Sequence, residues 1–186
     1  MPEVCPGAGD YVMRPGYDSV HRPRRRTRQE ISVRAMTEHQ PARAPEQRKQ
    51  DMLDRLEQDI DAWVATASPD GLPCLVPLSF VWDRGALLMA TRRGNPTAVN
   101  VTPSGPARVS LGHTRDVVLV DGTAQVVEGV DLPTGSADAF TTKLGWDPRA
   151  RSSWVYLRVT PDTVRAWREV NELAGRQLMR DGEWLV

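Results

Sequence analysis

A chain of 186 residues with 40% hydrophobic residues is long enough to form one domain with a buried core. Its 24 basic residues are balanced by 24 acidic ones, so no overall charge favours nucleic acid or a membrane surface as a partner. The two cysteines lie in unrelated contexts, which argues against a disulfide framework or a zinc site, and no apolar run reaches the roughly 18 residues of a membrane span. Because the N-terminus also lacks the apolar core of a signal peptide, the sequence predicts a cytoplasmic protein.

Residues 1–45 differ in composition from the rest of the chain. They hold six prolines, three glycines and the basic run from Arg22 to Arg28, with too few apolar residues for a core face. We therefore expect a disordered tail before a domain that spans residues 46–186. The basic run could bind nucleic acid, but a solvated tail is the simpler interpretation. An artefact of the assigned start site is a third interpretation, since Met36 lies shortly before the ordered part.

From Glu46 to about Ala62, apolar residues recur every three or four positions among charged and amide side chains. This spacing predicts an amphipathic helix whose apolar stripe covers one end of the β-structure that follows. The stripe consists of Met52, Leu53, Leu56, Ile60 and Trp63.

The stretch from Ala62 to Asn100 indicates three strands joined by tight turns. The turns Pro69-Asp70-Gly71 and Asp83-Arg84-Gly85 each end on glycine, which adopts positive φ at little cost. The second strand is expected from Leu72 to Phe80 and is fairly apolar on both faces, which predicts burial on both sides.

Two prolines limit the pairing of this second strand. Pro73 and Pro77 have no N–H to donate to a β-ladder, so they predict a bulge or a gap in pairing. Such interruptions often occur where a ligand binds the free edge of a strand.

The loop of residues 91–97 (TRRGNPT) is the strongest candidate for a binding site. It places two guanidiniums, hydroxyls and an amide beside the N-terminus of a short helix, expected over residues 95–102, with a proline in the first turn. Its backbone N–H groups and four side chains could hold a phosphate or another anion, while a solvated loop is the alternative. The four side chains are Thr91, Arg92, Asn95 and Thr97. Asn100, on the same helix, either faces the same pocket or is a polar residue at the helix end.

The second half of the chain alternates short strands with turns. Strands are expected over residues 107–112, 116–127, 153–160, 163–167 and 183–186, with a bulge or sharp bend at Asp121-Gly122 and a turn at Pro161-Asp162. A helix over residues 136–144 ends at Gly145. About seven strands and three short helices predict a mainly β fold, a small antiparallel barrel with helical caps. Neither βαβ alternation nor a GxGxxG motif is present, which argues against a Rossmann fold.

No constellation of side chains in the sequence is typical of a hydrolase or a metalloenzyme. It has no nucleophile elbow, HExxH motif, Walker loop or carboxylate pair. His113 stands alone in a polar loop, where Arg115 and Asp116 are expected to pair with each other or with the backbone. If the protein is an enzyme, we expect a bound cofactor to carry the reaction.

Aromatic residues are concentrated in the second half, at Trp146, Trp154, Tyr156 and Trp167. They could stack on a planar cofactor, although packing in a core or a dimer interface is the commoner use of such residues.

The order of these motifs resembles a known family. ATASPDGLPCLVPLSFVWDRGALLMAT, then NPTAVNV, then RVSLGHTRDVVLVDGTAQVV is similar to the pyridoxamine 5′-phosphate oxidase-like, flavin-binding split-barrel proteins. The segments GWDPR, YLRVTP and AWRE resemble an actinobacterial subgroup of that family. The resemblance covers about residues 47–186.

The resemblance implies an antiparallel, six-stranded split β-barrel, a homodimer, and FMN or the deazaflavin F420 at the dimer interface. It implies that the cofactor phosphate binds the loop and helix after the third strand, at Thr91, Arg92, Asn95, Thr97 and Asn100. It also implies that part of the second strand lies against the flavin ring, at Val76, Pro77, Leu78 and Ser79.

Two departures from the family pattern limit the functional expectation. Thr97 stands where many members carry a lysine, so that one cation expected to neutralise the phosphate is missing, and Arg92 or Arg93 would have to replace it. The C-terminus lacks the Arg-x-His substrate signature, so we do not expect oxidation of vitamin B6 compounds. The remaining expectation is an oxidoreductase that transfers a hydride between FMN or F420 and a small organic substrate. A non-catalytic, cofactor-binding or carrier protein is the alternative.

Overall fold

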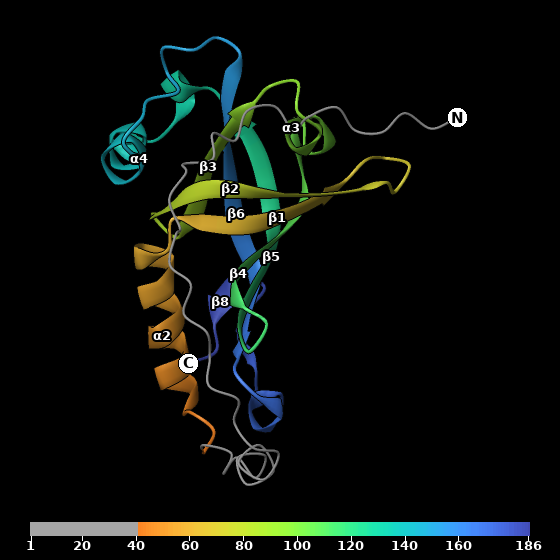
Figure 1. The fold of residues 1–186 in the computed structure, drawn as a ribbon, viewed down its shortest axis with the longest axis vertical. Coiled ribbons are helices and arrows are strands. Elements are labelled where there is room, and N and C mark those ends of the chain that lie inside the picture. The colour runs from red at the N-terminus through yellow and green to blue at the C-terminus, as the bar shows by residue number, and fades with distance from the viewer. Residues whose placement is uncertain (1–40) are drawn as a thin grey trace, which may run out of the picture. The chain divides into compact units, whose positions relative to one another are not determined.

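The computed structural model describes residues 41–186. Most of the predicted tail, including the basic run from Arg22 to Arg28, lies outside the described residues. The elements are α2 (Pro45–Gln58), β1 (Asp61–Ala67), β2 (Pro73–Asp83), β3 (Ala86–Arg92), α3 (Pro96–Asn100), β4 (Ser104–His113), β5 (Asp116–Val127), the 3₁₀ turn η1 (Gly129–Asp131), α4 (Ser136–Leu144), β6 (Trp154–Trp167), the 3₁₀ turn η2 (Val170–Glu172), β7 (Gln177–Arg180) and β8 (Glu183–Trp184) (Figure 1).

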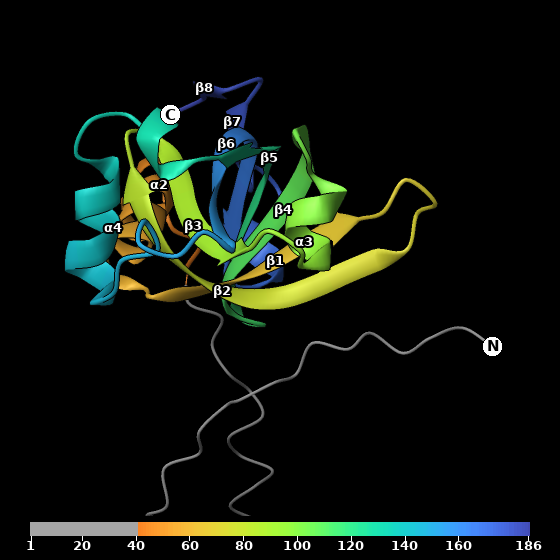
Figure 2. The same cartoon turned by 90° about the horizontal axis from the view of Figure 1, so that it is seen from above.

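The strands form an antiparallel barrel. Their order is β3-β2-β1-β4-β5-β6-β7-β8, and β3 also pairs with β6, which closes a ring of six strands (Figure 2). β7 and β8 continue the sheet beyond the ring. The prediction of a mainly β, antiparallel split barrel is therefore confirmed. No helix among residues 41–186 is both long and apolar enough to cross a lipid bilayer.

Alternating side chains fill the barrel with a continuous apolar core. Phe80, Met89, Val109, Val120 and Val159, each from a different strand, are completely buried in it. A second, smaller cluster lies between α4 and the outer side of β2, β3 and β6, where Phe140 packs edge-on against Tyr156.

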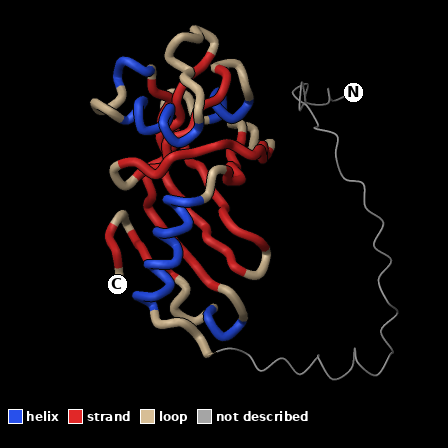
Figure 3. The backbone as a smooth tube through the Cα atoms, turned by 60° about the vertical axis from the view of Figure 1, so that its left-hand side comes forward, coloured by secondary structure: helices blue, strands red, loops and turns tan. Residues whose placement is uncertain are grey.

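The first helix is shorter than predicted. α2 ends at Gln58 and adds Met52 and Leu56 to the core, while the chain becomes extended at Asp59. Figure 3 shows the helices, among them α2, against the strands of the barrel. Trp63 belongs to β1 rather than to the helical stripe, and its side chain is 51% exposed. The prediction was wrong here because Trp63 fits a helical spacing with Ile60, whereas in the fold it alternates with the buried Ala62 and Val64.

The predicted turn at Pro161-Asp162 is also absent. β6 runs through it as one strand of 14 residues, and the register with β5 shifts between Asp121 and Gly122, where a bulge or sharp bend was expected. Asp121 pairs with Thr163 and Gly122 with Pro161, so the extra residue is Asp162 of β6. Gly122 pairs with Pro161, and a Cβ at residue 122 would lie 2.2 Å from the Thr160 carbonyl oxygen. The close approach of glycine lets the strand continue past the proline.

Smaller differences concern β2 and β4. The outer face of β2 is open in the single chain, where Leu75 is 60% exposed, so the predicted burial of both faces is not found. β4 begins at Ser104, three residues before the predicted strand over residues 107–112. The hairpin turns were predicted correctly: Arg84 and Gly85 both have positive φ, at 49° and 74°, as the tight turn between β2 and β3 requires.

Candidate functional site

The divergence of β2 and β3 creates the candidate site. β2 pairs with β3 only from Phe80 to Asp83, and its remaining residues, 73–79, pair with β1 alone. β3 pairs with β6 from Leu87 to Arg92, and its far end, Thr91 and Arg92, has no partner on β2. α3 follows directly and contacts β1, β2 and β3 beside the opening (Figure 2).

One edge of β2 is therefore open over residues 73–79. The N–H of Phe80 donates to the carbonyl of Ile60 at 2.9 Å, so even-numbered residues bond toward β1 and odd-numbered ones point to the opposite edge. The backbone groups of Leu75, Pro77 and Ser79 face that edge, where no strand of the described chain pairs with them. The predicted gap in pairing is thus found at the prolines, while the alternative, a bulge, is absent because the β1–β2 register is continuous.

The loop between β3 and α3 exposes one uncompensated cation. The Arg92 side chain is exposed and has no hydrogen bond or ion pair with the described residues. Arg93 is different, because its guanidinium lies 2.7 Å from Glu128, whose pKa it lowers, and its backbone N–H donates to the Ser153 carbonyl. Of the two arginines expected to replace the missing lysine, only Arg92 has no carboxylate partner among the described residues.

The remaining polar side chains of the loop anchor it to the barrel. Thr91 is buried, and its hydroxyl accepts a hydrogen bond from the Asn95 side-chain amide at 2.9 Å. Thr97 is only 2% exposed, with its hydroxyl 3.6 Å from the Cys74 sulfur. The backbone N–H of Thr97, in the first helical turn, has no carbonyl partner within α3. An anion at this position would thus meet the Thr97 backbone, because its hydroxyl points inward.

Thr66 and Cys74, which the sequence did not single out, hold α3 in place. The Asn100 side-chain amide, on α3, donates a hydrogen bond to the Thr66 hydroxyl at 3.1 Å. Thr66 of β1 pairs in turn with Cys74 of β2. The register set by the turn after Ala67 could have indicated this Thr66–Cys74 pair, since the hairpin was predicted correctly. The contact of both residues with α3 carries no local sequence signal.

The four strand residues of the predicted site point to opposite faces of β2. Val76 and Leu78 are half-buried on the inner face, and Leu78 packs against the core. Pro77 is exposed on the outer face, and the Ser79 hydroxyl donates to Asp61 at 2.6 Å. The structure thus brings the backbone groups of Pro77 and Ser79 to the open edge, while only the side chains of Val76 and Leu78 lie on the α3 side.

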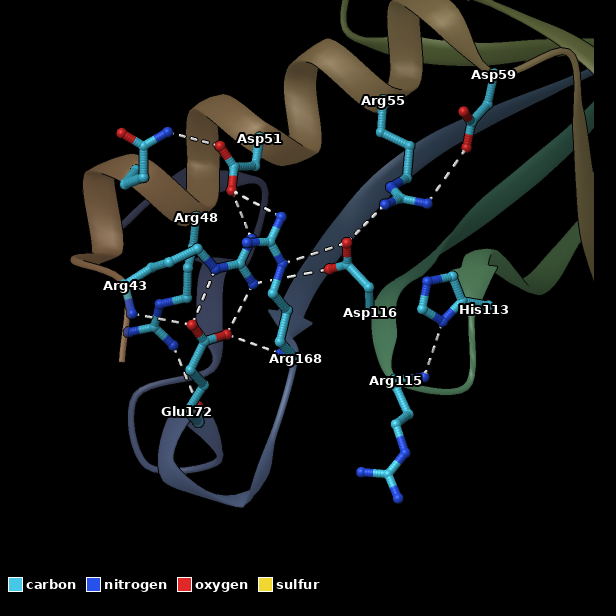
Figure 4. Close-up of polar contacts among 11 residues, drawn as sticks. Arg43, Arg48, Asp51, Arg55, Asp59, His113, Arg115, Asp116, Arg168 and Glu172 are labelled. Atoms are coloured by element: carbon cyan, nitrogen blue, oxygen red, sulfur yellow. Dashed lines mark hydrogen bonds and ion pairs between the residues drawn. The ribbon is translucent and has the colours of Figure 1, made fainter. Parts of the chain in front are cut away.

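A separate network of charges lies beneath α2 and shares no residue with this site (Figure 4). Glu172, 3% exposed, accepts hydrogen bonds from the backbone and guanidinium of Arg43 and from the Arg168 backbone N–H, at 2.7–2.9 Å. The Arg43 hydrogen bonds lower the pKa of Glu172 from 4.5 to about 2. This network joins α2 to the loop after β6, which is a structural role.

The expected ion pair between Arg115 and Asp116 is not found, because both residues have other partners. Asp116 lies 2.8 Å from Arg55 of α2, and Arg115 pairs instead with Glu169 at 2.8 Å. His113, expected in a loop, is the last residue of β4, and its side chain accepts a hydrogen bond from the Arg115 backbone N–H (Figure 4).

The closed six-stranded ring, the open edge of β2 and the polar loop at the end of β3 together define a split-barrel protein with a candidate anion site. The family model described as pyridoxamine 5′-phosphate oxidase matches residues 49–168, and the chain belongs to that family. None of the curated proteins matches the chain.

Solved structures agree with the fold. A conserved hypothetical protein of Mycobacterium tuberculosis has a TM-score of 0.55 at 16% identity, covering 66% of this chain and 86% of its own. The heme storage protein HutZ of Vibrio cholerae has a TM-score of 0.54 at 12% identity, covering 73% and 99%. General Stress Protein 26 of Bacillus anthracis has a TM-score of 0.50 at 18% identity, covering 64% and 92%. At these identities the likeness concerns the fold alone.

Proposed function

We propose that the chain binds a phosphorylated flavin-type cofactor, FMN or F420, between the open edge of β2 and the β3–α3 loop. The proposal rests on the presence, at one end of the barrel, of both a free strand edge on β2 and a guanidinium without a carboxylate partner, that of Arg92. Free backbone donors and acceptors suit the polar rim of a planar ring, and an unpaired arginine suits a phosphate. Membership of the family supports the same proposal.

The residues present fit the phosphate of such a cofactor. Arg92 would pair with it, the first-turn N–H of Thr97 would donate to it, and the Thr91–Asn95 hydrogen bond would hold the loop in shape. The backbone of Leu75 and Ser79 would meet the ring from the side, and Val76 would lie against it. When bound, the cofactor would supply the hydride chemistry, and the chain would orient it and exclude water.

FMN is the better supported of the two cofactors. The polyanionic tail of F420 would be best served by two free arginines, but the charge of Arg93 is compensated by Glu128. A single free cation matches the single phosphate of FMN.

We further propose a homodimer formed through the outer face of β1 and β2. Trp63 of β1 and Leu75 of β2 are 51% and 60% exposed. Pro77, also exposed, pairs with Trp63 across the two strands. An apolar patch of this kind on a projecting hairpin is typical of a protein interface. The proposed setting is the cytoplasm, where Cys74 would stay a free thiol.

We propose oxidoreductase activity on a small organic substrate, with a non-catalytic carrier as the second candidate. The inward-pointing Thr97 hydroxyl favours the second, because the loop offers little charge for tight retention of a phosphate. The test is to purify the protein, record its absorbance spectrum, and titrate FMN and F420 separately. Binding of neither cofactor would contradict both candidates. Binding followed by turnover with a reductant and a redox dye would support the enzyme, and binding without turnover would support the carrier.

A further inference from the structure

A pocket of about 490 Å³ contains none of the residues proposed to hold the cofactor. It adjoins the β3–α3 loop through Glu128, which lines the pocket and pairs with Arg93 of that loop. Its walls are Glu128 to Val130, at the end of β5 and the start of η1, residues of the loop before β6, and the first residues of β6. The loop before β6 and α3 lie at the same end of the barrel (Figure 1). The volume is within the usual range of small-molecule sites.

The pocket contains a buried donor without a partner. Tyr156 lines it and is only 2% exposed, and its hydroxyl has no hydrogen-bond partner in the described chain. Burial raises the pKa of this tyrosine, so the hydroxyl keeps its proton at neutral pH. A buried hydroxyl that makes no hydrogen bond is costly, and a ligand that accepts its proton would remove that cost.

The charges around the pocket leave one cation free. Arg149 is held by Asp138 at 2.9 Å and by Asp147 at 2.7 Å, and Glu128 is held by Arg93. Arg151, also in the lining, is exposed and has no carboxylate partner among residues 41–186. Arg151 is therefore the one cation of the lining without a carboxylate partner in the described chain, while Arg149 is shared by two carboxylates, Asp138 and Asp147.

The same pocket has an aromatic wall. Trp154 and Tyr156 are two residues apart on β6, so they lie on one face of the strand. Arg151 lies 6.0 Å from the centroid of the Trp146 ring, whose indole packs edge-on against Trp154. Gly129 lies against the same tyrosine: a Cβ at residue 129 would lie 3.0 Å from the Arg149 side chain and 3.5 Å from the Tyr156 ring.

We propose that this pocket binds a small planar carboxylate. The carboxylate accepts a hydrogen bond from the Tyr156 hydroxyl and pairs with Arg151, and the ring lies against Trp154. The proposal goes beyond the cofactor site, because its residues are different and its test needs no cofactor.

The experiment measures binding of 2-naphthoate and its neutral analogue 2-naphthamide to the full chain, without added cofactor, by calorimetry. We expect 2-naphthoate to bind at micromolar to millimolar concentrations and 2-naphthamide to bind more weakly. Tyr156→Phe is expected to weaken 2-naphthoate binding about tenfold. Arg151→Gln should remove most of the preference for the carboxylate. Arg158→Gln, on the same strand but outside the pocket, is the matched control and should bind as the wild type does.

A stability measurement separates this role from a structural one. Tyr156→Phe should leave the melting temperature of the free protein unchanged or higher, because the lost hydroxyl makes no internal hydrogen bond. Failure of 2-naphthoate to bind, or equal binding of the two naphthalenes, would overturn the proposal. So would an affinity unchanged in Tyr156→Phe, which would mean that the hydroxyl serves a bound water only, or a large drop in its melting temperature.

Discussion

Replacing Glu172 by glutamine tests the charge network beneath α2. The carboxylate is buried, and its pKa is lowered from 4.5 to about 2 by the hydrogen bonds of Arg43. Since one pKa unit corresponds to about 1.4 kcal/mol, the ionised carboxylate is worth about 3 kcal/mol of folding free energy at neutral pH. We expect Glu172→Gln to lose about that amount in urea unfolding at pH 7.

The pH dependence has a defined sign. Because the folded pKa is depressed, the stabilisation is fully present above pH 4.5 and is lost as the pH falls toward 2. The deficit of Glu172→Gln relative to the wild type should therefore shrink by about 2 kcal/mol between pH 7 and pH 3. Glu169→Gln is the matched control, because Glu169 pairs with an arginine that is 74% exposed and should cost less than about 1 kcal/mol. Equal losses for the two variants, or a deficit independent of pH, would refute the reasoning.

Two further predictions concern the barrel and its outer face. Gly122→Ala should destabilise the fold by about 3 kcal/mol in urea unfolding, because the new methyl would overlap the Thr160 carbonyl. Gly94→Ala is the control and should cost less than about 0.5 kcal/mol, because the space around Gly94 is open. Similar losses of stability in the two variants would mean that the bulge lies elsewhere. Leu75→Asp should convert the proposed dimer to monomer in sedimentation velocity, while Val170→Asp, an exposed apolar residue off that face, should not; a dimer unaffected by Leu75→Asp would exclude this interface.

Local signals were sufficient for much of the fold. The strand over residues 116–127 and the helix over residues 136–144 were predicted with the observed bounds, because apolar runs end at turn residues and at Gly145. The errors arose where the local sequence indicates one structure and a partner elsewhere in the chain decides another. Pro161 indicates a turn by its local sequence, but in the sheet it pairs with Gly122 and the strand continues.

The candidate site was predictable as a polar loop, but its charge was not. The ion pair that neutralises Arg93 joins it to Glu128, 35 residues away, and no spacing rule indicates it. The inward direction of the Thr97 hydroxyl likewise depends on contact with Cys74 on another strand. The assignment to an actinobacterial subgroup, the cofactor and the dimer remain predictions.

The most direct test of the central claim is the affinity of FMN and of riboflavin, which lacks the phosphate, for the wild type, Arg92→Gln and Arg93→Gln. Because Arg92 is free and Arg93 is paired, we expect Arg92→Gln to weaken FMN binding roughly tenfold or more and to leave riboflavin binding unchanged. Arg93→Gln should have a smaller effect on FMN. If the wild type binds FMN no more tightly than riboflavin, or if Arg92→Gln weakens both ligands equally, the β3–α3 loop is not the phosphate site.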